Sequence, residues 1–210
     1  MTAALPASAW LLTLVASSAL AACDQTNGDG PANGSATVAK HYVGPKPEGV
    51  SSPNDAVTTT FYIPQAAIGD MFEIEAGEIA SVRARSGEVK AFARRMVSDH
   101  RKSSEILRRF VAEHPVNIAI PSNIDPRRGA MLANLNQAGA REFDAVYIGE
   151  QAAAHQEAYN LHSSYSRRGD YPELKAVAAK IADLVAEHRR HVEVLDAKFG
   201  PEAQSIPAGK

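Results

Sequence analysis

The chain has 210 residues, of which 45% are hydrophobic and 22% are charged, and its formal net charge is -2. This composition is typical of a globular protein, and its length is enough for one domain with a hydrophobic core. Nucleic acid is not expected as a partner, because phosphate binding needs a basic excess or a basic stripe.

An export signal peptide is predicted over residues 1–22. Its apolar part, residues 7–22, is too short and too rich in alanine and serine for a membrane-spanning helix, but it suits the apolar region of a signal. The letters LAAC at residues 20–23 resemble the bacterial lipobox, in which the signal is cut before a cysteine that then carries a lipid anchor. Cys23 is the only cysteine, so an intramolecular disulfide is impossible. The alternative is a plain cleaved signal followed by an incidental cysteine.

A disordered tether is predicted over residues 23–57, beginning at the lipidated Cys23. Glycine, proline, asparagine and serine dominate this stretch, and it has no apolar periodicity. A flexible linker of roughly thirty residues has a root-mean-square span of about 30 Å, enough to hold a domain off a membrane. We therefore expect a lipid-anchored protein of the cell envelope that faces the periplasm, on either the inner or the outer membrane.

The first half of the folded domain, which is expected over residues 58–200, is predicted to be two long helices. Apolar residues recur at spacings of three and four, as on one face of a helix. The first helix should begin between Thr60 and Gln65, and the break at residues 85–88 is so short that the two helices form an antiparallel hairpin. The second helix should end at His114, because the residue before a proline is pushed out of the helical region.

The second half is predicted to contain a short helix and two more long ones. Asp125 and Pro126 form an N-cap and first-turn pair for a helix through about Gln137. A long helix follows over residues 140–167. Gly169 stops it, Asp170 and Pro172 open the last helix, and Gly200 ends that helix. Four long helices with an extended connection between the second and third predict an all-α four-helix bundle with a crossover, followed by a flexible tail at residues 201–210.

Two histidines occupy positions where a leucine would be expected. His100 lies near the middle of the apolar stripe of the second helix, and His188 has the same place in the last helix. In the first helix, Glu75 shares a face with the large apolar residues Ile68, Met71, Phe72, Ile79 and Val82. Glu73 shares another face with the small residues Ala76, Gly77, Ala80 and Ala84, where a second helix could approach closely. A polar stripe on the third long helix consists of Asp144, Gln151, His155 and His162.

Four runs of sequence carry a family resemblance: MFEIEAGEIA, VKAFARRMVSDH, FDAVYIGEQAAAH and LVAEHRRHVEVL. They resemble successive motifs of the DUF4142 family of exported bacterial proteins, and the resemblance covers residues 61–199. It implies a ferritin-like helical bundle in the cell envelope, without a settled function. The family's recurrent polar positions fall on Glu73, Asp99, His100, Asp144, Tyr147, His155 and His188.

Ferritin-like bundles build metal sites from carboxylates and imidazoles that point inward, and the di-iron version uses a Glu-x-x-His motif that this sequence lacks. The candidate ligands are Glu75 (or Glu73 in its place), His100, His155 and His188, one from each long helix. This set suits a single Zn, Cu, Ni or Fe ion, because imidazole and carboxylate both bind borderline divalent metals. The residues expected to orient these ligands by hydrogen bonds are Glu73, Asp99, Asp144, Tyr147 and Gln151.

The alternative is that the same buried side chains only hydrogen-bond one another and fix the register of the bundle. The sequence contains neither a Gly-x-Ser-x-Gly motif nor a phosphate-binding glycine loop, so an enzymatic role is not expected. Two hypotheses of function follow. One is a lipid-anchored protein that sequesters, stores or senses a transition metal. The other is an envelope scaffold whose helical faces bind a protein partner.

Overall fold

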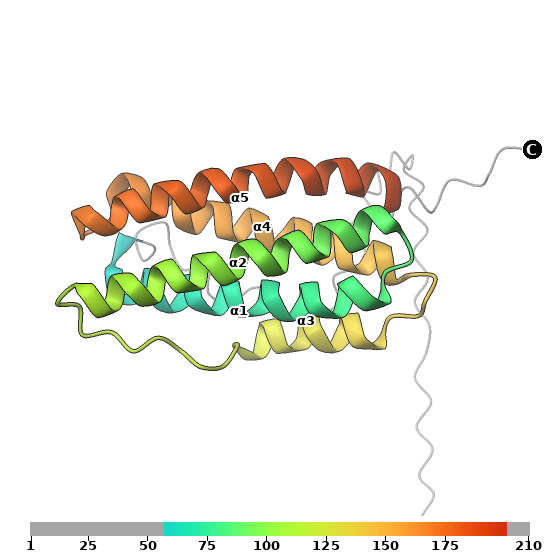
Figure 1. Cartoon of the computed structure of the whole chain (residues 1–210), viewed down its shortest axis with the longest axis horizontal. Helices are drawn as coiled ribbons and strands as arrows, with labels where there is room; N and C mark the ends of the chain where they lie inside the picture. The colour runs from blue at the N-terminus through green and yellow to red at the C-terminus, as the bar shows by residue number, and fades with distance from the viewer. Residues whose placement is uncertain (1–56, 201–210) are drawn as a thin grey trace, which may run out of the picture. The chain divides into compact units, whose positions relative to one another are not determined.

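The computed structural model describes residues 57–200, which form five α-helices and no strand (Figure 1). The helices are α1 (Thr59–Arg83), α2 (Gly87–Glu113), α3 (Pro126–Gln137), α4 (Phe143–Arg168) and α5 (Pro172–Phe199). This confirms the predicted all-α class. None of these helices carries an apolar stretch long enough to span a bilayer. The predicted signal peptide, Cys23, the tether up to residue 56 and the tail lie outside the described residues.

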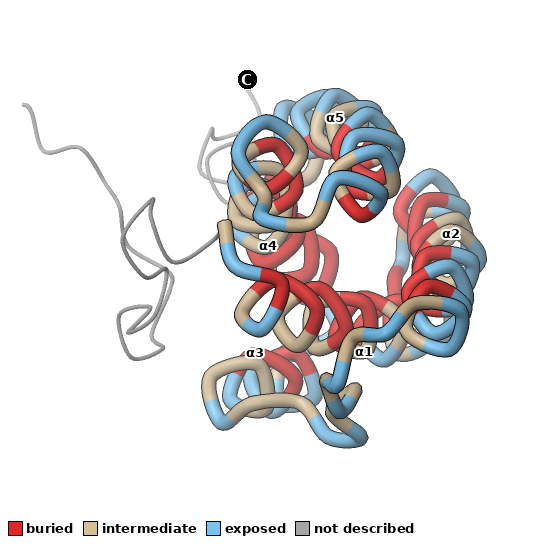
Figure 2. The backbone as a smooth tube through the Cα atoms, turned by 90° about the vertical axis from the view of Figure 1, so that its left-hand side faces the viewer, coloured by how far each residue is buried: buried red, intermediate tan, exposed pale blue. Residues whose placement is uncertain are grey.

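Two helical hairpins form the bundle. α1 packs along α2, and α4 packs along α5, while α1 also contacts α4 and α2 contacts α5. Viewed along its length, the bundle has its buried backbone facing a common interior, and α3 lies outside it, beside α1 (Figure 2). α3 contacts α1 and α4. Every long helix therefore contributes one face to the same interior.

The turn between α1 and α2 is held by a side chain from the other hairpin. Asp144, in the first turn of α4, accepts hydrogen bonds from the backbone N–H groups of Arg85 and Ser86, each at 2.8 Å. The Ser86 hydroxyl in turn accepts the Glu88 N–H at 3.1 Å and caps α2. Asp144 thus fixes one end of the bundle.

The close approach predicted for the small-residue face of α1 is confirmed. A Cβ atom added at Gly77 would lie 2.8 Å from a methyl carbon of Val97 and 2.9 Å from the backbone oxygen of Ala93. Both of these atoms belong to α2. Only glycine leaves room for the two backbones at this point.

The prediction that the face of α1 carrying Glu75 enters the core is right for Phe72, which is buried, but wrong for Glu75 and Val82. Glu75 is exposed, and Val82 is 75% exposed, whereas Glu73 is buried together with the small residues Ala76, Gly77 and Ala80. The reason lies in the packing of α1 against the other helices. Contact with α2, α3 and α4 covers α1 where the backbones can come close, and small side chains allow this better than large ones.

The beginnings and ends of the other helices agree with the predicted caps at most positions. Asp125 caps α3 by accepting the Arg128 N–H at 2.8 Å, and α2 ends at Glu113, directly before His114. Asp170 is the exception. Its carboxylate accepts the Thr59 N–H at 2.8 Å and so connects the start of α1 to the α4–α5 turn, while α5 has no side-chain cap.

The apolar core is divided into two clusters. One is built around Phe72, Phe92, Met96, Phe143, Ile148 and Leu195, and the other around Tyr62, Leu107, Tyr165, Leu174, Ile181 and Val185. On each long helix, buried polar residues stand between the residues of these two clusters. A polar layer therefore crosses the bundle between its two apolar cores.

Candidate functional site

The polar layer draws on all four long helices. Asp70 and Glu73 come from α1, His100 from α2, Gln151 and His155 from α4, and His188 from α5. Each of these residues is buried, and none exceeds 4% exposure. Their position follows from helical periodicity, because each replaces an apolar residue on a stripe that faces the bundle interior.

Three histidines meet at the centre of this layer. The ring centroids of His100 and His188 are 5.5 Å apart, those of His155 and His188 5.4 Å, and those of His100 and His155 5.8 Å. One ring nitrogen from each histidine lies within 4.8 Å of the corresponding nitrogens of the other two. The structure thus brings together three of the four ligands proposed from the sequence, each from a different helix.

Each histidine uses one ring nitrogen in a polar contact. The Nδ1 atom of His100 lies 2.8 Å from Asp70 Oδ1, and the Nε2 atom of His188 lies 3.1 Å from Asp99 Oδ2. The Nδ1 atom of His155 lies 3.0 Å from the backbone oxygen of Gln151, four residues earlier in α4. These contacts fix the orientation of all three rings.

The other ring nitrogen of each histidine has no partner. His100 Nε2, His155 Nε2 and His188 Nδ1 are buried and make no hydrogen bond. A buried polar atom without a partner is rare in folded proteins and points to a missing water, ion or ligand. Three such nitrogens in one cluster make up the central feature of the site.

The pKa values of the three histidines are shifted in different directions. Burial lowers the pKa of His188 to about 3, and the neighbouring His100 and His155 act in the same direction. Burial also lowers the pKa of His155. At His100 burial again lowers the pKa, but the hydrogen bond and the charge of Asp70 outweigh it and raise the pKa above its ordinary value. His155 and His188 are therefore neutral near pH 7, as metal ligands must be.

Glu73 takes the place in the interior that was predicted for Glu75. One Glu73 carboxylate oxygen accepts the side-chain N–H of Gln151 at 2.7 Å, and the other lies 3.6 Å from His155 Nδ1. Glu75 lies on the exposed side of α1. Tyr147, which was expected to orient a ligand, is buried beside the charge of Glu73, but its hydroxyl has no partner.

Two expectations about supporting residues have different outcomes. Asp99 contacts His188, as a residue that orients a ligand would. Asp144 does not reach the histidines, because both of its carboxylate oxygens bind the backbone of the α1–α2 turn. Its place on the polar stripe of α4 was identified correctly, but the stripe extends past the end of the polar layer.

Sequence reasoning missed Asp70. Its carboxylate is buried and holds His100 at 2.8 Å. The signal was available, because Asp70 precedes Glu73 by three residues and therefore shares its helical face. His162, which was placed on the same polar stripe as His155, lies outside the histidine cluster. Its Nδ1 lies 2.9 Å from the Tyr62 hydroxyl in the second apolar cluster, and burial lowers its pKa to about 3.

Asp99 is the point where the site comes nearest to solvent. Its side chain is 15% exposed, and it forms ion pairs with Arg95 at 3.2 Å and Lys102 at 3.3 Å. Arg95 also pairs with Glu187 on α5 at 3.1 Å. This network lies over the seam between α2 and α5, above His188.

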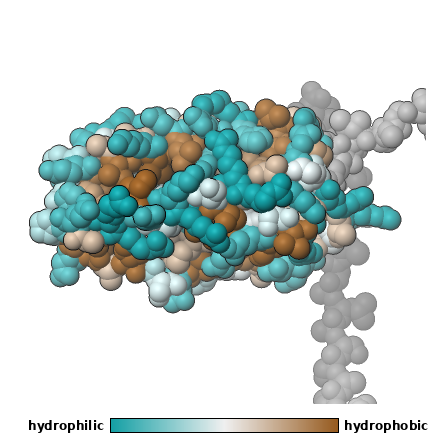
Figure 3. Space-filling model, in the orientation of Figure 1, coloured by the Kyte–Doolittle hydropathy of each residue, from teal (hydrophilic) through white to brown (hydrophobic). Residues whose placement is uncertain are grey.

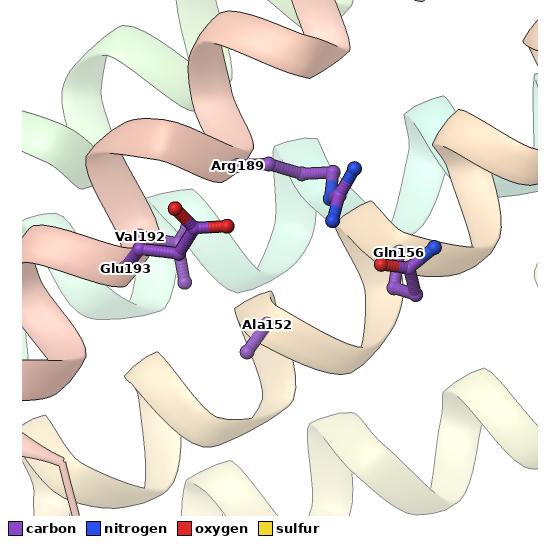
Figure 4. A pocket seen from close by; sticks show the side chains of 5 residues that line it. All are labelled: Ala152, Gln156, Arg189, Val192 and Glu193. Atoms are coloured by element: carbon purple, nitrogen blue, oxygen red, sulfur yellow. The ribbon is translucent and has the colours of Figure 1, made fainter.

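A separate small pocket of about 180 Å³ lies on the surface between α4 and α5 (Figure 4). Arg189 and Glu193 from α5 and Gln156 from α4 border it, and none of the three clustered histidines lines it. The guanidinium of Arg189 lies 4.9 Å from the centre of the Tyr159 ring. This pocket is not part of the histidine site.

Comparisons with known proteins agree with the helical architecture. The model of the family described as "Domain of unknown function (DUF4142)" matches residues 45–195. A solved structure titled "CopM in the Cu(II)-bound form" is similar, with a TM-score of 0.56 and 19% identity, and the match covers 65% of this chain and 94% of that one. The comparison with curated proteins found no significant match.

Proposed function

The chain belongs to the DUF4142 family, whose description assigns no function, and we propose from its own buried site that it binds one transition-metal ion through His100, His155 and His188. One observation carries this proposal. Three imidazole nitrogens without hydrogen-bond partners lie buried in one cluster. Each unsatisfied buried group costs about 1 to 3 kcal/mol, and a single bound ion would satisfy all three.

The geometry of the cluster is close to that of a metal site. Ligands at about 2.0 to 2.1 Å from a tetrahedral ion are roughly 3.4 Å apart. One nitrogen from each histidine lies within 4.8 Å of the other two, so an inward movement of the rings by at most about 1 Å would give this spacing. Three protein ligands leave a fourth position for a water or another small ligand, as in open metal sites.

The surroundings also suit a metal. A histidine that binds a metal usually has its other ring nitrogen bonded to a carboxylate or a backbone carbonyl, which fixes the ring. Asp70, the Gln151 carbonyl and Asp99 have this role for His100, His155 and His188. A purely structural network would be expected to pair both nitrogens of each ring.

We take Cu(II) as the first candidate ion. Imidazole suits Cu, Zn, Ni and Fe, and affinities for divalent metals generally peak at Cu(II). The similar fold of CopM in its Cu(II)-bound form supports testing copper first. We also propose a ferritin-like four-helix bundle whose halves are joined by a crossover. The course of α3 beside α1 in Figure 1 supports this topology.

The physiological setting proposed with this site is the cell envelope. Lipidation of Cys23 would anchor the protein there, facing the periplasm, and the bundle would sequester, store or sense the metal. The scaffold alternative has less support in the described part of the chain. Its exposed large hydrophobic residues Val82, Ile106 and Val194 lie on three different helices, and the face in Figure 3 is mostly hydrophilic with scattered apolar patches.

The test is a set of thermal melts on the untagged full chain, combined with elemental analysis. Wild type, His100→Leu, His188→Leu and the double variant are melted with chelator and then with Cu, Zn, Ni or Fe. Wild type should gain stability by an amount that grows with the ratio of free metal to Kd, and the double variant should not. His191→Leu is the matched control, because His191 lies one turn after His188 and packs on Phe92 outside the cluster.

A wild type that shows no metal-dependent shift would end the metal proposal. In that case His100→Leu should still cost about 1 to 3 kcal/mol, because it removes the 2.8 Å hydrogen bond of the buried Asp70 carboxylate. His188→Leu should cost less, because Asp99 keeps its ion pairs with Arg95 and Lys102. The polar layer would then be structural, and the scaffold hypothesis would remain. Equal metal responses in wild type and the double variant would place the bound metal elsewhere.

A further inference from the structure

A second group of unpartnered polar atoms lies beside the histidines. The Tyr147 hydroxyl, one Glu150 carboxylate oxygen and the Gln151 amide oxygen are buried and make no hydrogen bond. Their residues are 0%, 5% and 0% exposed. Glu150 and Gln151 follow Tyr147 on α4 by three and four residues, so the three residues share one side of that helix. All three unpartnered atoms are oxygens, in contrast to the nitrogens of the histidine cluster.

Side chains from two other helices hydrogen-bond the neighbouring side-chain atoms of Gln151 and Glu150. Glu73 of α1 accepts the amide N–H of Gln151 at 2.7 Å. Asn134 of α3 donates to the other carboxylate oxygen of Glu150 at 2.8 Å. Burial, with a further contribution from the Glu73 charge, raises the pKa of Tyr147. The group therefore lies where α1, α3 and α4 meet, and α3 covers its outer side.

The two carboxylates in this group have no cationic counterpart. Among the described residues, no lysine or arginine pairs with Glu73 or Glu150, and the histidine nearest to Glu73 is His155 at 3.6 Å, whose pKa burial lowers. Buried carboxylates are normally paired with a cation or bound to a metal, because leaving a charge unpaired in an apolar interior is costly. The site thus has two carboxylates and a set of unpartnered oxygens that a cation would satisfy.

We infer that Glu73, Tyr147, Glu150 and Gln151 form a second cation site, which takes a hard divalent cation such as Ca²⁺ or Mn²⁺. Carboxylate, amide and phenol oxygens are hard donors, which these ions prefer to imidazole. Mg²⁺ fits less well, because it keeps several waters and this group is buried. The inference does not depend on a metal at the histidines, although Glu73 lies next to both groups.

The experiment uses Tb³⁺, a hard luminescent cation that a nearby tyrosine sensitises, as the probe of the full chain. Tb³⁺ should give a saturable signal of about one equivalent that Ca²⁺ and Mn²⁺ displace. Glu150→Gln keeps the shape but removes a charge, and it should weaken the affinity about tenfold or more. Glu105→Gln is the matched control, because Glu105 is exposed and pairs only with Arg109. Tyr147→Phe should reduce the sensitised emission.

The double variant His100→Leu/His188→Leu separates this inference from the proposed function. It should bind Tb³⁺ as wild type does, even though it no longer responds to Cu, Zn, Ni or Fe. A Tb³⁺ signal that is absent, or that is unchanged in Glu150→Gln, would overturn the second site and leave the oxygens to buried water. Circular dichroism melts of each variant show that the fold is retained.

Discussion

At the scale of single residues, Asp70 decides the protonation of the histidine cluster. It raises the pKa of His100, against the effect of burial, while His155 and His188 stay neutral. Below that raised pKa, His100 carries a proton that a metal must displace. Metal affinity should therefore fall as the pH decreases toward acidic values.

Replacing Asp70 should make this proton release smaller. In Asp70→Asn the carboxylate that stabilises protonated His100 is gone, so the pKa of His100 falls and less proton is released when metal binds. Isothermal titration of Cu(II) in two buffers of different ionisation enthalpy measures the number of protons. Equal release by wild type and Asp70→Asn would show that Asp70 does not control His100.

The second prediction for a single residue concerns the titration of Glu150. Burial raises the pKa of its carboxyl from 4.5 to about 7. Between these values the folded chain binds more protons than the unfolded one, so stability should decrease as the pH rises from 4.5 through 7. The loss should be about 1 to 3 kcal/mol.

The variant Glu150→Gln removes this titration and should be more stable than wild type at pH 8, with little difference near pH 4.5. Urea unfolding at both pH values, in the presence of chelator, measures the effect. Glu105→Gln, at an exposed position, should follow wild type. An equal loss of stability in wild type and Glu150→Gln would assign the pH dependence to another group.

At the scale of helices, the contact of α1 with α2 depends on Gly77. Alanine is a better helix former by about 0.5 to 1 kcal/mol, but at Gly77 its methyl group would lie 2.9 Å from the backbone oxygen of Ala93. Backbone cannot move aside as a flexible side chain can. Gly77→Ala should therefore destabilise the bundle by about 1 to 3 kcal/mol, despite the gain in propensity.

Gly149 provides the matched control. It lies within α4, and a Cβ atom there would have no atom within 4 Å. Gly149→Ala should therefore stabilise the protein by about 0.5 to 1 kcal/mol. Denaturant unfolding of both variants checks the difference. Stabilisation by both substitutions would mean that α1 and α2 are not closely packed at Gly77.

At the scale of the whole molecule, the anchor at Cys23 remains a prediction. If Cys23 carries a lipid, Cys23→Ala should move the protein from the membrane fraction to the soluble periplasm. Cell fractionation followed by immunoblotting measures the distribution. A Cys23→Ala protein that still sediments with membranes would contradict lipid anchoring through this residue.

The tether gives a second prediction at this scale. Residues 24–57 were predicted from their composition to bury no core, but the backbone oxygen of Val57 accepts the Asp170 N–H at 3.0 Å. Deletion of residues 24–56 should leave the melting temperature unchanged. Comparison of the thermal melts of the full and the shortened chain is sufficient. A decrease of several degrees on deletion would show that part of this segment packs on the bundle.

The sequence by itself determined the features that depend on local periodicity and capping. The all-helical class, the break between α1 and α2, the end of α2 before Pro115 and the Asp125 cap of α3 all follow from interactions within a few residues. The inward positions of His100 and His188 follow in the same way. α2 and α5 each have a single apolar face, so a polar residue in the middle of that face must point inward.

Only the tertiary structure decided which side of α1 is buried and which polar groups meet. α1 has two faces that satisfy the helical period, and the contacts with α2, α3 and α4 placed Glu73 and Asp70 inside and Glu75 outside. Likewise, His100, His155 and His188 converge only because the two hairpins pack at one axial offset. Asp144, on the same stripe as His155, lies about 16 Å away along α4 at 1.5 Å per residue. Residue spacing within one helix determines which way a side chain points, but packing between helices determines which side chains touch.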